Sequence, residues 1–152
     1  MEITVDDPLR DDVLVLLDEH LADMRATSPP ESVHALDPHA LVGPGLTFWT
    51  LRDDGVLLGC AALKEIDPGH AEIKSMRTTA AARRRGVASR LLDHVLEAAR
   101  ERGYLRISLE TGTQDFFAPA RSLYASRGFV ECGPFAQYVV DPNSAFFSRT
   151  LT

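Results

Sequence analysis

The residues best placed to do chemistry are residues 83–89, the run Arg-Arg-Arg-Gly-Val-Ala-Ser, which precedes a long amphipathic helix. The first N–H groups of a helix lack intrahelical partners and carry partial positive charge, so they bind phosphate when a loop lets it approach. Gly86 has no side chain to block that approach, and the arginines offer charge-assisted hydrogen bonds. We predict that the whole run binds an anionic cofactor: Arg83, Arg84, Arg85, Gly86, Val87, Ala88 and Ser89.

The same run allows other interpretations. Three consecutive arginines are commonly a solvated turn, and the run lacks both the Gly-Lys-Ser/Thr ending of nucleotide hydrolases and the three-glycine spacing of dinucleotide sites. A nucleic-acid contact is a third interpretation. The formal net charge of -6 argues against nucleic acid and against an anionic membrane as partners, because positive fields attract them. The loop by itself predicts an anion site and no particular ligand.

The elements that must position this loop follow from the spacing of apolar residues and from turn residues. Asp54-Gly55 lies between two strand-like runs and predicts a hairpin, and Gly103 ends the long helix. We expect strands near 3–5, 46–51, 56–64, 70–77, 105–109, 129–132 and 146–151, and helices near 9–25, 87–102, 119–127. This order predicts an α/β fold with a mixed sheet and helices on its faces, in one domain over residues 1–152.

Two spaced motifs carry a resemblance to a known family. Arg83, Gly86 and Ala88 fit Arg/Gln-x-x-Gly-x-Gly/Ala at a strand-to-helix junction, and residues 123–129 read Leu-Tyr-x-x-x-Gly-Phe. Over most of its length the chain resembles the GNAT superfamily of N-acetyltransferases. The turn at residues 141–144, Asp-Pro-Asn-Ser, also resembles that of a subgroup of small bacterial acetyltransferases.

The resemblance implies a fold and a co-substrate. The sheet would be mostly antiparallel and twisted, with the fourth and fifth strands splayed apart so that the pantetheine arm of acetyl-CoA enters between them. Splaying leaves backbone N–H and C=O groups unpaired, and a ligand amide can satisfy them. By position, Met76, Arg77 and Thr78 would face pantetheine, and residues 84–89 would face the pyrophosphate.

The resemblance also suggests the catalytic residues. Acyl transfer to an amine needs a base, because an alkylammonium with a pKa near 10.4 is almost fully protonated at neutral pH. Glu72 is our first choice, and Glu110 at the end of the next strand is its rival; a surface pair of Glu72 with Lys74 is the structural alternative. Alternation predicts Glu72, Lys74 and Met76 on one face of their strand. Tyr124 corresponds to the family tyrosine that protonates the CoA thiolate, and a backbone N–H near Met76 would hold the oxyanion.

The acceptor side is less defined by the sequence. Glu31 and His34, in the proline-rich segment after the first helix, are candidates for substrate binding, together with Glu110. The other histidines show no ligand spacing, so we predict no metal. Cys60 and Cys132 are expected as small apolar strand residues and not as nucleophiles.

These observations predict an N-acetyltransferase that moves an acetyl group from acetyl-CoA to a primary amine of a small molecule or peptide, by direct attack in a ternary complex. The alternative is a non-catalytic acyl-CoA sensor, which would keep the loop at 83–88 but need neither Glu72 nor Tyr124. No apolar run approaches the roughly 20 residues of a membrane span, so a cytoplasmic protein without membrane or nucleic-acid partners is expected. The last two strands, expected to be long, could pair across a homodimer.

Overall fold

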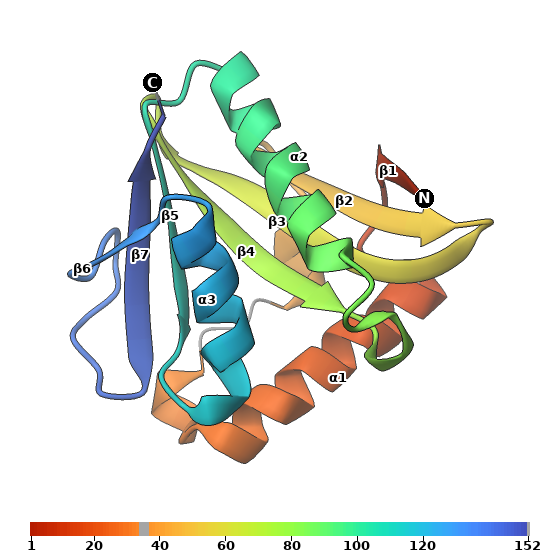
Figure 1. The fold of residues 1–152 in the computed structure, drawn as a ribbon, viewed down its shortest axis with the longest axis horizontal. Helices are drawn as coiled ribbons and strands as arrows, with labels where there is room; N and C mark the ends of the chain where they lie inside the picture. Colours follow the sequence, from red (N-terminus) through yellow and green to blue (C-terminus); the bar gives the residue numbers. More distant parts are fainter. Residues whose placement is uncertain (34–36, 152) are drawn as a thin grey trace.

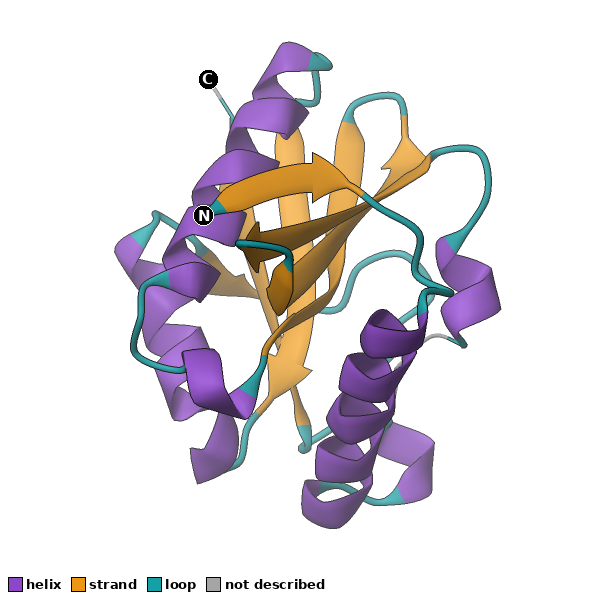
Figure 2. Ribbon diagram, turned by 90° about the vertical axis from the view of Figure 1, so that its right-hand side faces the viewer, coloured by secondary structure: helices purple, strands orange, loops and turns teal. Residues whose placement is uncertain are grey.

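The computed structural model describes residues 1–33 and 37–151, and these form one seven-stranded sheet with helices on both sides (Figures 1 and 2). The strands are β1 (Glu2–Val5), β2 (Leu46–Asp53), β3 (Val56–Asp67), β4 (His70–Thr78), β5 (Arg106–Gly112), β6 (Val130–Cys132) and β7 (Ser144–Thr150). The α-helices are α1 (Asp11–Thr27), α2 (Val87–Glu101) and α3 (Ala118–Ser126). Short 3-10 turns cover Pro30–Ser32, Pro38–Leu41, Ala80–Ala82 and Asp115–Phe117.

The sheet order is β1-β2-β3-β4-β5-β7-β6, and its neighbours pair antiparallel except for β4 and β5, which run parallel. The predicted mixed sheet and the order of its elements are confirmed. Asp54 and Gly55 both have positive φ, at 52° and 82°, which is the backbone of the hairpin turn that the sequence predicted. The prediction of two long final strands is wrong for β6, which has three residues because the chain leaves the sheet after Cys132.

Two apolar clusters lie on the two faces of the sheet. The larger one packs α2 and Tyr124 of α3 against the strands, and the smaller one packs α1 against Phe48, Cys60 and Ala62. Cys60 is buried in β3 and Cys132 lies in β6, as predicted for strand residues. No helix in the described part of the chain is long and apolar enough to cross a membrane.

Helix α2 lies unusually close to β3, at Gly59. A Cβ placed on Gly59 would come within 2.9 Å of side-chain atoms of both Val87 and Leu91 and 3.0 Å of the Arg77 carbonyl. The amphipathic pattern of α2 places Val87 and Leu91 on the buried face, and both are almost fully buried. This contact fixes the position of the α2 N-terminus relative to β4, which pairs with β3.

Candidate functional site

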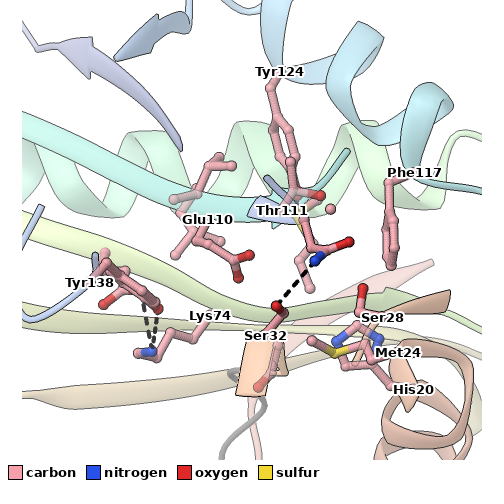
Figure 3. A pocket seen from close by; sticks show the side chains of 17 residues that line it. His20, Met24, Ser28, Ser32, Lys74, Glu110, Thr111, Phe117, Tyr124 and Tyr138 are labelled. Atoms are coloured by element: carbon pink, nitrogen blue, oxygen red, sulfur yellow. Dashed lines mark hydrogen bonds and ion pairs between the residues drawn. The ribbon is translucent and has the colours of Figure 1, made fainter. Parts of the chain in front are cut away.

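The site begins where β4 and β5 separate. Their parallel ladder covers only His70–Glu72 of β4 and Arg106–Ser108 of β5, although both strands continue beyond it. The predicted splay between these two strands is therefore confirmed. A pocket opens at this point, and it is lined by both strands, by the C-terminal half of α1, by α3 and by the segment between β6 and β7 (Figure 3).

An extra residue in β4 changes which side chains face this pocket. Lys74 pairs with Ala62 and Arg77 with Cys60, so three steps along β4 match two along β3, and Ser75 has a positive φ of 53°. A bulge of this kind reverses the alternation of the strand beyond it. Our prediction that Met76 shares a face with Glu72 is therefore wrong: Met76 packs against the cluster under α2 and α3.

The bulge is supported from the neighbouring strand. The Cys60 thiol donates a hydrogen bond to the Ser75 carbonyl at 3.2 Å. Burial raises the pKa of Cys60 to about 12, which keeps the sulfur protonated and able to donate. Cys60 is thus a structural donor that satisfies a carbonyl displaced from the ladder.

Glu72 is buried at one side of the pocket, where its carboxylate has two partners. The Tyr138 hydroxyl donates to its Oε2 at 2.6 Å, and Lys74 Nζ lies 3.2 Å from the same oxygen. Lys74 also donates to the Tyr138 hydroxyl at 3.1 Å, and Figure 3 shows these two side chains next to each other. The three groups therefore form a closed triangle. The pair of Glu72 with Lys74 that we weighed as a surface feature exists, but inside the pocket. Burial and the Glu72 charge raise the pKa of Tyr138 above its usual range.

Glu110 lines the same pocket in a different electrostatic setting. Burial raises its pKa to about 7, against the opposing effects of the nearby Ser144 hydroxyl and the Lys74 charge. Within the described ranges Glu110 forms no ion pair. A carboxyl group with a pKa near neutrality can both take and release a proton under physiological conditions.

Tyr124 reaches the pocket from α3. Its ring packs against Phe129 and Phe147, with centroids 5.8 and 6.5 Å away, and its hydroxyl lies 3.8 Å from the Met76 sulfur. Burial, with the nearby Glu110, raises the pKa of Tyr124 to about 12. The hydroxyl is therefore protonated at neutral pH and lies in the gap between β4 and β5.

The arginine-glycine run lies beyond the far end of β4 and outside the pocket lining (Figure 1). Gly86 is the N-cap of α2 with φ 76°, and no side chain caps the helix within the described chain. The side chain of Val87 is buried in the core, so this residue presents only its backbone. The Arg83 guanidinium lies 5.9 Å from the Phe116 ring, and Arg85 lies 3.5 Å from an Asp53 carboxylate oxygen.

The remaining predicted residues of this run and of β4 have the following positions. Arg84 is exposed with φ 65°, and Ala88 and Ser89 are half-buried in the first turn of α2. Thr78 pairs with Gly59 in the β3–β4 ladder. Arg77 does not face the gap: its guanidinium forms an ion pair with Asp23 on α1, because the bulge turns it toward that helix.

The residues after α1 that we predicted for substrate binding are Glu31 and His34. Glu31 is exposed and does not line the pocket, whereas its neighbour Ser32 is buried and does; His34 lies outside the described residues. The Ser32 hydroxyl donates to Asp141 at 2.5 Å and accepts from Asn143 at 3.3 Å. The turn that the sequence singled out at 141–144 therefore holds the segment after α1 over the pocket.

Several residues that line the pocket were not predicted from the sequence, among them His20, Ser32 and Tyr138. His20 had a local signal, since it occupies the face of α1 on which Val13, Leu16 and Leu17 are buried. Tyr138 had none, because it lies in an irregular segment between β6 and β7. Among residues 1–33 and 37–151, no group of three or more His, Cys, Asp or Glu side chains is placed to hold a metal ion.

Comparisons with known proteins match the chain to a protein family and to solved structures of similar fold. Residues 13–129 match the model of the Acetyltransferase (GNAT) family. The uncharacterised N-acetyltransferase YsnE of Bacillus subtilis is 52% identical over 151 residues, which cover 99% of this chain and 100% of that protein. A crystal structure from Klebsiella pneumoniae, described as an acyl-CoA N-acyltransferase, is 25% identical and covers 99% of this chain and 97% of its own, with a TM-score of 0.80. An aminoglycoside 6'-N-acetyltransferase complexed with coenzyme A is 16% identical and covers 100% and 98%, with a TM-score of 0.69.

Proposed function

Since the chain belongs to the GNAT acetyltransferase family, we propose that it transfers the acetyl group of acetyl-CoA to the primary amine of a small molecule or peptide, by direct attack in a ternary complex. The observation that carries this proposal is the gap between β4 and β5, because a proton acceptor and a proton donor, Glu110 and Tyr124, both line it.

The residues around the gap fit acetyl-CoA. Among the residues that the structure describes, β4 has no partner on its β5 side beyond Glu72, so its backbone is available to the amides of a pantetheine arm. The uncapped N-terminus of α2 fits the pyrophosphate. A Cβ on Gly86 would meet no atom within 4 Å, so the surface there is open to a ligand. The structural neighbour that binds coenzyme A has the same fold.

We propose Glu110 as the base in preference to Glu72. Glu72 accepts a hydrogen bond from Tyr138 and is paired with Lys74, so protonating it would break a compensated buried cluster. Glu110 has no ion pair to lose within the described residues, and its pKa is already about 7. Glu72 and Lys74 then act as a rigid wall of the acceptor pocket.

The proposed reaction uses three groups of this chain. Glu110 takes a proton from the acceptor ammonium, directly or through one water, and the freed nitrogen attacks the thioester carbonyl. A backbone N–H beside the Ser75–Met76 bulge stabilises the negative oxygen. Tyr124 gives its proton to the sulfur as the carbon–sulfur bond breaks. The second nitrogen proton, passed directly or through water, reprotonates Tyr124, and Glu110 releases its proton to solvent.

The test combines binding and turnover. Calorimetry should detect acetyl-CoA binding to the native protein, and a thiol reagent should detect CoA release with at least one member of a panel of primary amines. Binding of acetyl-CoA without release for any amine would instead support the acyl-CoA sensor that we weighed from the sequence. An absence of binding would overturn both.

A further inference from the structure

His20 is a polar residue in the otherwise apolar stripe of α1. Val13, Leu16 and Leu17 are buried on this face, and the next turns bring His20 and Met24 to the same side. Here the helix passes from the core to the pocket, which His20, Met24 and Ser28 line at intervals of four residues. The His20 ring lies beside Met24 and Ser28 at one side of the pocket, and Glu110 lies across from them (Figure 3).

The hydrogen-bonding capacity of this wall is unused. Within the described residues, His20 Nδ1 is shielded from solvent and has no hydrogen-bond partner. Ser28 is half-buried and lines the same pocket, and its hydroxyl forms no hydrogen bond in the described part of the chain. Burial, with the Arg77 charge, lowers the pKa of His20 to about 4, so its ring is neutral at physiological pH. A neutral imidazole offers one donor and one acceptor. Because buried polar groups are normally paired, an orphan beside a ligand pocket indicates a partner on the ligand.

The charges around the pocket indicate what kind of group that partner is. Lys74 is paired with Glu72, and Arg77 next to His20 is paired with Asp23. Glu110 is thus the lining carboxylate left to attract an ammonium. A carboxylate or a second ammonium placed near His20 would lose its hydration without gaining a counter-charge.

We infer that His20 and Ser28 form a subsite for a neutral polar group, so that the acceptor is an amine that also carries a hydroxyl or an uncharged amide. This inference rests on the proposed function, because it names the class of amine that the acetyl group reaches. The amine end lies at Glu110, and the hydroxyl or amide end hydrogen-bonds to the wall formed by α1.

The experiment compares amines of equal length by CoA release. For amino alcohols and amino amides, kcat/KM should be at least about 10-fold higher than for the matching alkylamines, diamines and amino acids. The others leave the buried His20 Nδ1 without a hydrogen-bond partner or place a charge beside it. His20→Phe should abolish this preference by raising KM for the amino alcohols more than for the alkylamines. His20→Gln, which can still donate and accept, should retain part of it, and Ser28→Ala should reduce it.

His39→Phe makes the same chemical change at an exposed position and should keep the preference. If His20→Phe fails to fold, judged by its thermal melt and acetyl-CoA binding, His20→Gln and Ser28→Ala provide the test. Equal use of amino alcohols and alkylamines by the native enzyme, or a preference that survives both the His20 and the Ser28 changes, would overturn the inference. Those outcomes differ from the failure of the proposed function itself, in which no amine is acetylated.

Discussion

Two carboxylates on neighbouring strands, Glu72 and Glu110, share one pocket but differ in environment. Glu72 has a cation and a phenol hydroxyl as partners. Burial raises the pKa of Glu110, and no ion pair with another described residue compensates for it. Burial and charge compensation act in opposite directions on a carboxyl group, so neighbouring acids can serve different functions. From the sequence we ranked Glu72 first and Glu110 second, and our proposal reverses that order. The reversal depends on Tyr138, which is 66 residues away from Glu72, so no local pattern could have indicated it.

The raised pKa of Glu110 predicts a pH dependence. The base acts in its deprotonated form, so kcat/KM should rise through about pH 7 and level off above it. In Glu110→Gln this limb should disappear, and kcat should fall about 10²- to 10⁴-fold. Glu72→Gln is the matched comparison. If the rise of kcat/KM with pH disappeared in Glu72→Gln and remained in Glu110→Gln, Glu72 would be the base.

The same shift predicts an effect on stability. The pKa of Glu110 is raised from 4.5 to about 7 in the folded state. The contribution of this group to the free energy of unfolding is therefore fully present below pH 4.5 and is lost as pH rises through 7. Glu110→Gln should therefore gain free energy of unfolding relative to native at pH 8, by up to about 3 kcal/mol at 1.36 kcal/mol per pKa unit. Urea unfolding of both proteins at pH 4 and pH 8 measures this gain, and a difference that does not change with pH would contradict it.

Tyr124 allows a separate test of the acid. Tyr124→Phe removes the hydroxyl but keeps the ring that packs on Phe129 and Phe147, so the fold and acetyl-CoA binding should persist. We expect kcat to fall about 10²-fold or more with little change in the Kd for acetyl-CoA. Steady-state kinetics and calorimetry measure the two effects. An unchanged kcat would show that water protonates the thiolate.

At the scale of elements, the sequence predicted those features that depend on residues close together in the chain. The Asp54-Gly55 turn, the α2 stripe and its ending near Gly103 all follow from residues within one or two turns. The bulge at Ser75 could not be read from β4, because it depends on the register with β3 and on the donor at Cys60. That single extra residue decides that Met76 faces Tyr124 and that Arg77 faces α1, so it limits how well the site could be predicted.

The close contact between α2 and β3 gives a prediction at the same scale. Gly59→Ala places a methyl group 2.9 Å from Val87 and Leu91, so α2 must shift, at a cost of about 1–3 kcal/mol. Acetyl-CoA should also bind more weakly, because the shifted helix carries the proposed phosphate site. Thermal unfolding and calorimetry measure these effects. Gly133→Ala, where a Cβ meets nothing within 4 Å, should leave both nearly unchanged.

At the scale of the whole molecule, distant segments close one side of the pocket. Ser32, Asp141 and Asn143 join the segment after α1 to the loop before β7, and Gln114 donates to Asn143 at 3.0 Å. The closure of this side of the pocket therefore depends on three parts of the chain that no local pattern connects. Sequence could identify the 141–144 turn, but its partner Ser32 follows only from the three-dimensional arrangement.

A second long-range cluster joins β1, α1 and β2 through Asp6. Its carboxylate accepts from Thr50 at 2.6 Å and from Arg52 at 3.3 Å, and Arg52 also binds Asp12 at 2.6 Å. Burial would raise the pKa of Asp6, but these hydrogen bonds outweigh it and lower the pKa to about 2. The stabilisation is thus present above the unfolded value of 3.8 and is lost as pH falls toward 2.

This cluster predicts the acid stability of the molecule. Asp6→Asn should lower the free energy of unfolding by about 2 kcal/mol at pH 7, and the difference from native should shrink between pH 4 and pH 2 as the native carboxylate is protonated. Urea unfolding over this range measures the difference. Asp18→Asn, at an exposed position on α1, should match native throughout. If the free energy of unfolding of Asp6→Asn were lower than that of native by the same amount at every pH, the asparagine would be disturbing the packing. The charge of Asp6 would then not be what stabilises the contact of the β1–α1 connection with β2.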